Sequence, residues 1–158
     1  MADFVSGLTT YTPVGKRNIL RSAQPGSYTV LQKTVSYLAY PTEVIDGFTQ
    51  KVLQEGEVMA ALTSGTHSGK VVPYQTFQAD GTTPFTDGRS DLANLVGICK
   101  DWFGAQLMDR DVEAGILVRG YLVQSWCTIR NNLGVRVALT NTVADALRSK
   151  KNLDILFS

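Results

Sequence analysis

The stretch that decides the fold runs from Leu95 to Ile129. It reads LVGICKDWF over 95–103, MDRDVE over 108–113 and GILVRGYLVQSWCTI over 115–129. Both apolar runs are rich in the β-branched and aromatic residues that favour strands. The sequence therefore predicts a β-hairpin-like unit joined by an acidic turn, which is a scaffold and not a catalytic motif.

The rest of the chain adds further strand signals. Residues 28–40 alternate between apolar or aromatic and polar positions and predict one or two strands. The apolar runs 58–62 and 70–74 flank a Gly/Ser-rich turn, which predicts a hairpin, and residues 153–157 predict a last strand. Asp46-Gly47 marks a turn. Residues 75–93, rich in Thr, Asp, Gly and Pro, predict a long surface loop.

One segment, Thr142 to Lys150, favours a helix. Thr142 and Asp145 match a capping box, and basic residues crowd the final turn, where cations complement the helix dipole. The residues predicted to share its apolar face are Val143, Ala146 and Leu147. The expected fold class is therefore mainly β with one short C-terminal helix: a small β-rich domain over residues 34–158 that follows an N-terminal arm.

The arm is predicted to be extended and to span residues 1–33. Its first 25 residues mix Gly, Ser, Thr and Pro with isolated apolar residues and show no period. Ile19 and Leu20 lie beside Lys16, Arg17 and Arg21, and such an extended segment suits strand addition to the sheet edge of a partner. A frayed terminus is the alternative interpretation.

The composition of the chain limits the classes of function that it can have. The chain has 158 residues and a net charge of +1, with five basic and eleven acidic residues in 43–113. An acidic body with a mildly basic arm suits protein docking at least as well as nucleic-acid binding, which usually shows a denser basic stripe. Cys99 and Cys127 lie in apolar runs and are expected to be buried thiols. No signal peptide or membrane span is recognised, so folding in a reducing cytosol is expected.

No pattern of reactive side chains supports an enzyme. Gly65 to Lys70 resembles a phosphate-binding loop, but the glycine spacing is wrong and a strand is expected to follow. His67 is the single histidine, and the acidic run 108–113 lacks the spacing of a calcium loop. No Gly-x-Ser-x-Gly elbow is present. The sequence therefore predicts no catalytic residue, metal or cofactor.

Four segments carry a resemblance to a known family: GEVMAAL (56–62), GKVVPY (69–74), LVGI (95–98) and GILVRG (115–120). Their order and spacing, over roughly residues 43–158, resemble the head decoration proteins of lambda-like tailed phages. The resemblance implies a β-tulip-like body, a homotrimer on the exterior of the expanded capsid, and stabilisation of the head against the pressure of its DNA. It implies synthesis in the host cytoplasm. It also implies that the protein has no catalytic activity and contacts neither nucleic acid nor a membrane.

The resemblance also implies residue roles. The major capsid protein would contact arm residues Lys16, Arg17, Ile19, Leu20, Arg21, Tyr28, Val30 and Leu31, while Trp102, Phe103 and Trp126 are candidate trimer or neighbour contacts. The arm, the 75–93 loop and residues 121–141 are longer than in the short family members. Two alternatives stay open: another phage β module from a tail or baseplate, and a small trimeric β-barrel nucleotide hydrolase.

Overall fold

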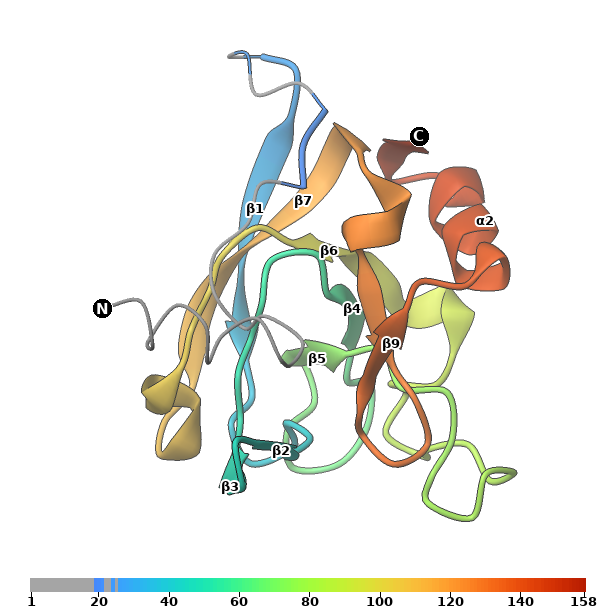
Figure 1. The fold of residues 1–158 in the computed structure, drawn as a ribbon. Helices are drawn as coiled ribbons and strands as arrows, with labels where there is room; N and C mark the ends of the chain where they lie inside the picture. The colour runs from blue at the N-terminus through green and yellow to red at the C-terminus, as the bar shows by residue number, and fades with distance from the viewer. Residues whose placement is uncertain (1–18, 22–23, 25) are drawn as a thin grey trace.

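The computed structural model describes residues 19–21, 24 and 26–158. Within this part of the chain the protein is mainly β, with one short α-helix near the C-terminus (Figure 1). The predicted fold class is therefore confirmed.

Five strands close into a small barrel. They are β1 (Thr29–Val35), β4 (Val58–Ala61), β5 (Val71–Pro73), β6 (Leu95–Cys99) and β7 (Val112–Leu122). β1 pairs in parallel with β5, and the ring continues through antiparallel β5–β4, β4–β6, β6–β7 and β7–β1 pairs. Closure leaves these strands without a long free edge. The predicted pairing of the two central runs and the 58–62/70–74 hairpin are both confirmed.

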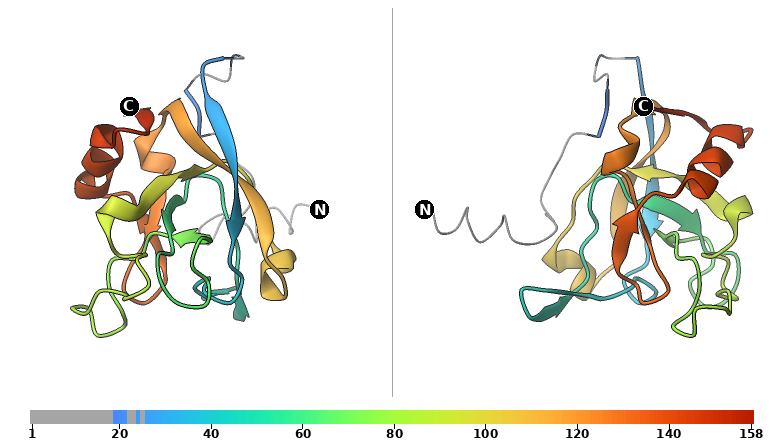
Figure 2. Two further views of the ribbon diagram at one scale, coloured as in Figure 1. Left: turned by 180° about the vertical axis from the view of Figure 1, so that it is seen from behind. Right: turned by 45° about the vertical axis from the view of Figure 1, so that its right-hand side comes forward.

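Further elements surround the barrel. β10 (Asp154–Phe157) adds in parallel to the end of β7. Two hairpins, β2 (Glu43–Ile45) with β3 (Phe48–Gln50) and β8 (Thr128–Arg130) with β9 (Arg136–Ala138), form separate two-stranded sheets. Helix α2 (Asn141–Ser149) lies on the opposite flank of the barrel from β1, as the views in Figures 1 and 2 agree. Three 3-10 turns complete the set: η1 (Leu92–Asn94), η2 (Ala105–Met108) and η3 (Gln124–Trp126).

The wall of the barrel separates two apolar cores, because successive strand residues point to opposite faces. Ile116 belongs to the inner core and its neighbour Leu117 to the outer core. The inner core contains Val35, Tyr40, Leu53, Met59, Val71, Cys99, Leu107, Val112, Ala114 and Ile116.

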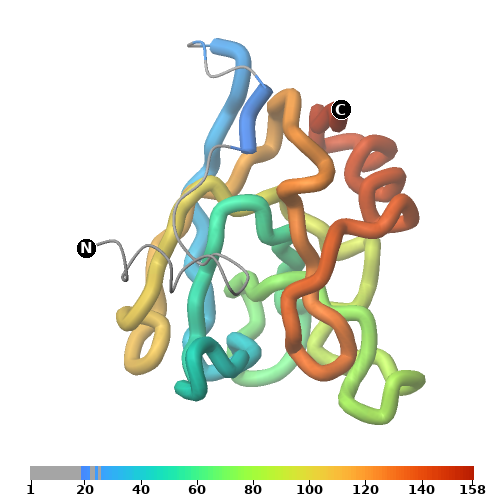
Figure 3. The backbone as a smooth tube through the Cα atoms, in the orientation of Figure 1, coloured from blue at the N-terminus to red at the C-terminus, as the bar shows by residue number. Residues whose placement is uncertain are grey.

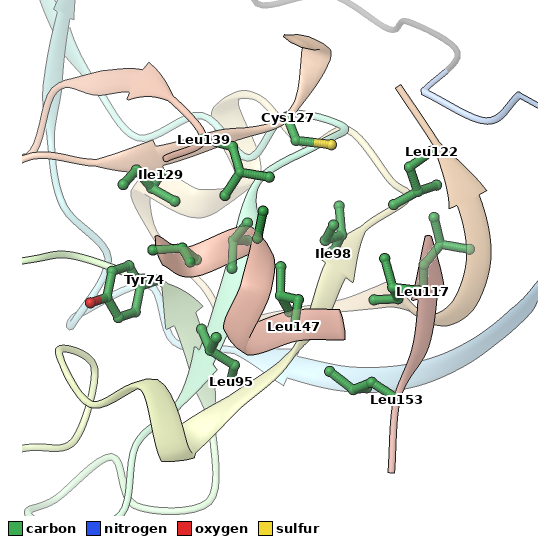
Figure 4. Packing of buried hydrophobic residues seen from close by; sticks show 14 of the residues in the cluster. Tyr74, Leu95, Ile98, Leu117, Leu122, Cys127, Ile129, Leu139, Leu147 and Leu153 are labelled. Atoms are coloured by element: carbon green, nitrogen blue, oxygen red, sulfur yellow. The ribbon is translucent and has the colours of Figure 1, made fainter. Parts of the chain in front are cut away.

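The outer core fills the space between the barrel and the elements that cover it. Figure 4 shows Leu147 of α2, Leu153 before β10 and Leu139 after β9 converging on Ile98 and Leu117 of the barrel. Both cysteines are buried, one in each core. The prediction of buried thiols is confirmed.

Gly97 lets two barrel strands approach closely. Its φ is +139°, and a Cβ built there would lie 2.2 Å from the carbonyl oxygen of Leu117 on β7. The register between β4 and β6 also shifts next to it, between Met59 and Ala60. A residue without a side chain is therefore required where the small barrel bends.

The helix differs in detail from its prediction. Thr140 is the N-cap, without a side-chain hydrogen bond, and Asp145 pairs with Arg148, so the capping box between Thr142 and Asp145 does not form. The buried face consists of Val143, Ala144 and Leu147, with Ala146 only partly buried. The helix starts at Asn141, one residue before Thr142, and Ala144 takes the place predicted for Ala146 on the buried face.

The predicted arm boundary also needs correction. Residues 29–33, assigned to the arm, lie in β1, whose register with β7 runs from Thr29↔Arg119 to Val35↔Val112. Backbone pairing with the longest strand of the barrel makes them part of the body. The structure places the boundary between arm and body before Thr29 and not at Lys33.

Candidate functional site

The described part of the arm adds as a short strand to the end of β7. Leu20 faces Leu122 in an antiparallel bridge. The Arg21 amide donates to the Tyr121 carbonyl at 2.8 Å, and the Val123 amide donates to the Ile19 carbonyl at 2.9 Å. Figure 3 shows this blue segment beside the orange end of β7. The N-terminal segment of this chain is therefore able to form strand pairing, here with its own body.

The side chains of this segment complete the outer core. Ile19 is fully buried and Leu20 is 6% exposed. A Cβ built at Gly56 would lie 2.6 Å from the Trp126 carbonyl oxygen and 3.3 Å from Ile19 Cγ2, so chain segments meet closely here. Ile19 and Leu20 therefore pack against other residues of the same chain. Lys16 and Arg17 lie outside the described residues.

The other predicted arm residues have mixed positions. Arg21 is exposed and its Nε donates to Ser158 Oγ at 2.6 Å. Tyr28 and Val30 are partly buried against the outer core. Leu31 is 48% exposed on β1. The contact of these residues with a capsid protein stays a prediction.

The three predicted aromatic contacts do not form one surface. Phe103 exchanges two backbone hydrogen bonds of 2.9 Å with Leu53 and packs against the inner core. Trp102 is partly buried, and its indole Nε1 is buried without a hydrogen-bond partner. Only Trp126, in η3, is substantially exposed, at 45%. Phe103 therefore has a packing role, and Trp126 is the most exposed of these three aromatic residues.

A second exposed surface lies where the arm docks. Tyr121 and Leu156 are directly opposite each other on β7 and β10 and are 42% and 54% exposed. Arg119 and Asp154 are opposite each other two residues earlier and form an exposed ion pair at 3.6 Å. These four residues, here called the β7–β10 face, combine apolar area with one charge pair. Sequence reasoning missed this face because only the register shows that the four residues share it.

A buried ionic cluster joins the barrel to both hairpins. Arg130 of β8 is fully buried, and its Nε donates to Glu57 Oε1 at 2.8 Å. Arg136 of β9 pairs with Glu43 of β2 at 2.7 Å and with Glu57 at 3.3 Å. The Tyr40 hydroxyl lies 2.7 Å from Glu57 Oε2. Two arginines and two glutamates balance in charge, so the cluster positions the surrounding elements without a net buried charge.

The cluster changes the protonation of its members. Burial raises the pKa of Glu57, but Arg130 and Arg136 more than offset this, so the pKa lies below its ordinary value. Burial and the Glu57 carboxylate hold the pKa of Tyr40 well above its ordinary value. The sequence signal was available: Arg130 and Arg136 each follow an apolar residue in a strand-like run, where an arginine must find a partner if it points inward.

The acidic run 108–113 and the glycine-rich turn 65–70 have structural contacts within the described residues. Asp109 pairs with Arg110 at 3.0 Å, and Asp111 pairs with Lys70 at 2.6 Å. Glu113 accepts a hydrogen bond from Thr34, so the three carboxylates have separate partners. The turn that contains His67 leads into β5, as expected, and not into a helix. Over the described residues, no three His, Cys, Asp or Glu side chains are grouped to hold a metal ion.

Comparison of the chain with known protein families, with curated proteins and with solved structures finds no significant match. None of the helices in the described part of the chain has the length and apolar character needed to cross a membrane.

Proposed function

We propose that this protein decorates the exterior of an expanded phage capsid as a homotrimer and stabilises the capsid against internal DNA pressure. The observation that carries the proposal is the strand addition of Ile19–Arg21 to the end of β7. It supports an arrangement in which an N-terminal segment is docked on a closed β body. The resemblance of segments 56–62, 69–74, 95–98 and 115–120 points the same way.

The physical logic rests on anchoring. A cement protein transmits force from one capsid subunit to the next, so the segment that contacts the capsid must be attached to the body. Ile19, fully buried in the outer core, supplies such an anchor for the residues that precede it. Several anchored segments on one oligomer raise the effective concentration of each contact, so that modest individual contacts give tight retention.

The β7–β10 face is the second element of the proposal. Tyr121 and Leu156 are exposed apolar side chains beside the anchored segment. A few side chains near the centre of an interface supply most of its binding energy, and tyrosine is among the residue types enriched there. We assign this face to contact with the capsid or a neighbouring copy, and Trp126 to the same role.

The experiment is co-sedimentation with expanded, undecorated capsids of the phage that encodes the chain. Three forms are compared: the full chain, a chain lacking residues 1–18, and Tyr121→Ser/Leu156→Ser. Deletion stops before Ile19, so the anchor and β1 stay in place and the body keeps its fold. Phe48→Ser is the matched control, because Phe48 is 70% exposed on the separate β2–β3 hairpin.

We expect saturable binding of the full chain, loss of binding on deletion, reduced binding of the double variant and no change for Phe48→Ser. A folded full chain that does not bind these capsids contradicts the proposal. Binding to purified tails instead would favour the alternative of a tail or baseplate module.

A further inference from the structure

A pocket of about 610 Å³ lies on the barrel flank, away from the anchored segment. It is lined by the turn after β4, by Tyr74 at the end of β5 and by the 84–94 loop. Residues distant in sequence therefore build its walls, and the long loop contributes most of them. Neither residues 19–21 nor the β7–β10 face takes part in it.

Tyr74 points a polar group into this pocket. The residue is 7% exposed, and its ring packs in the outer core. In Figure 4 its hydroxyl oxygen points away from the packed side chains. No described residue forms a hydrogen bond with this hydroxyl, and it is not among the fully buried polar atoms, so it is open to the pocket. Burial and the charge of Asp91 raise its pKa, so the hydroxyl keeps its proton and is available to donate.

The 84–94 loop holds two hydrogen-bond acceptors in place beside the Tyr74 hydroxyl. Asp91 Oδ1 accepts from the Ala93 amide at 2.9 Å and caps η1, which leaves Oδ2 for a ligand. Asn94 Nδ2 donates to the Gly88 carbonyl at 3.0 Å, which orients Oδ1 of the same amide. A Cβ built at Gly88 would lie 2.6 Å from Thr63 Oγ1 and 2.9 Å from Asn94 Nδ2, so this wall is tightly packed.

The remaining wall is apolar. Phe85, Leu92 and Pro84 line it, and Phe85 is held by the guanidinium of Arg89, 4.5 Å from its ring centre. A hydrogen bond of 3.1 Å from the Phe85 amide to Ser90 Oγ fixes the backbone there. The pocket thus offers a rigid apolar surface opposite a few convergent polar groups, which is the usual composition of a small-molecule site.

The charge of the lining restricts the ligand. Among the described residues that line the pocket, Asp91 is the single charged one, and none of them is a lysine, arginine or histidine. Phosphates and other anions need such cations or a group of amide donors. Sugar hydroxyls, in contrast, both donate and accept, and the C–H face of a sugar ring packs on apolar and aromatic surfaces.

We propose that this pocket binds a neutral hexose-type saccharide unit. The Tyr74 hydroxyl and the Asp91 carboxylate hydrogen-bond its hydroxyls, and Phe85 and Leu92 pack against its ring. This activity goes beyond capsid decoration and does not depend on it: a particle that carries the protein would display a saccharide-binding site at each copy.

The test is titration of the full-length protein with D-glucose, D-galactose, D-mannose and N-acetyl-D-glucosamine, monitored by saturation-transfer NMR and by shifts of backbone amides. Tyr74→Phe removes the unpartnered hydroxyl and keeps the ring in the core. Asp91→Asn removes the charge and keeps a side chain that can cap η1. Tyr121→Phe, on the β7–β10 face, is the matched control.

We expect saturable binding of at least one of these sugars, with shifts confined to residues 63, 74 and 84–94. Loss of one hydrogen bond in Tyr74→Phe weakens binding about tenfold, while Tyr121→Phe binds like the wild type. Unchanged thermal unfolding of Tyr74→Phe excludes a folding defect. Absence of saturable binding by all four sugars, or equal affinity of the wild type and Tyr74→Phe, overturns the proposal. Neither result depends on whether the protein binds capsids.

Discussion

The inner and outer cores differ in how the chain builds them. The inner core is enclosed by a ring of strands, and its members lie between Val35 and Ile116. The outer core draws on both ends of the chain, from Ile19 to Ile155, and is covered by α2, β10 and the short anchored segment. A closed ring supports itself, whereas a layer closed by terminal segments opens when one of them leaves. The two cores should therefore respond differently to substitution.

The largest effect is expected at the joint between the two layers. Arg130→Met leaves the Glu57 carboxylate buried, with the longer contact to Arg136 as its remaining ion pair. Removing one partner of a buried ion pair costs about 3–5 kcal/mol. Urea unfolding should show this loss. Arg119→Met, which breaks the exposed pair with Asp154, is the control and should cost less than about 1 kcal/mol. Similar losses for both variants would mean that the cluster does not join the layers.

Gly97→Ala tests the wall of the barrel. The added Cβ would approach the Leu117 carbonyl at 2.2 Å, and φ is positive. We expect a loss of about 2–4 kcal/mol from strain and overpacking. Gly65→Ala is the matched control, since its φ is +85° and nothing lies within 4 Å of its added Cβ. The difference between the two variants in chemical denaturation isolates the contact from the backbone preference. Equal losses would contradict a close approach of β6 and β7.

Ile19→Ala tests the outer layer alone. Truncation of a fully buried isoleucine costs about 2–4 kcal/mol, and we expect part of that loss to appear as local opening. Leu31→Ala, at a position 48% exposed, should have a small effect. Thermal unfolding combined with limited proteolysis measures both. Unchanged protease resistance and stability of Ile19→Ala would show that Ile19 does not hold the outer layer closed.

The smallest effect concerns pH. The pKa of Glu57 is lowered in the folded state, so its contribution to stability is fully present above its unfolded pKa, near 4.5, and is lost as pH falls through the folded value. Each unit of lowering corresponds to about 1.4 kcal/mol. Between about pH 6 and about pH 3, the free energy of unfolding of the wild type should fall by more than that of Glu57→Gln. Parallel losses would show that Glu57 does not titrate with folding.

Local sequence signals predicted the strands and missed their closure. The strand-like apolar runs 95–103 and 115–129, the Asp46-Gly47 turn and the C-terminal helix were all visible, because each depends on near neighbours. The parallel β1–β5 pair and the Arg130–Glu57 contact join residues far apart in the chain, and no local pattern specifies them. The pairing of 29–33 with β7 was missed for the same reason. Lone arginines in the strands of 128–138 were the one available hint of the cluster.

Native-state amide hydrogen exchange tests the difference between the layers most directly. Amides of residues 112–117 in β7 should exchange only through global unfolding. The amides of Arg21 and Val123, which join the anchored segment to the end of β7, should exchange by local opening, at least about 30-fold faster. Protection of Arg21 and Val123 equal to that of the barrel amides would contradict the account, because it would make the two layers a single cooperative unit.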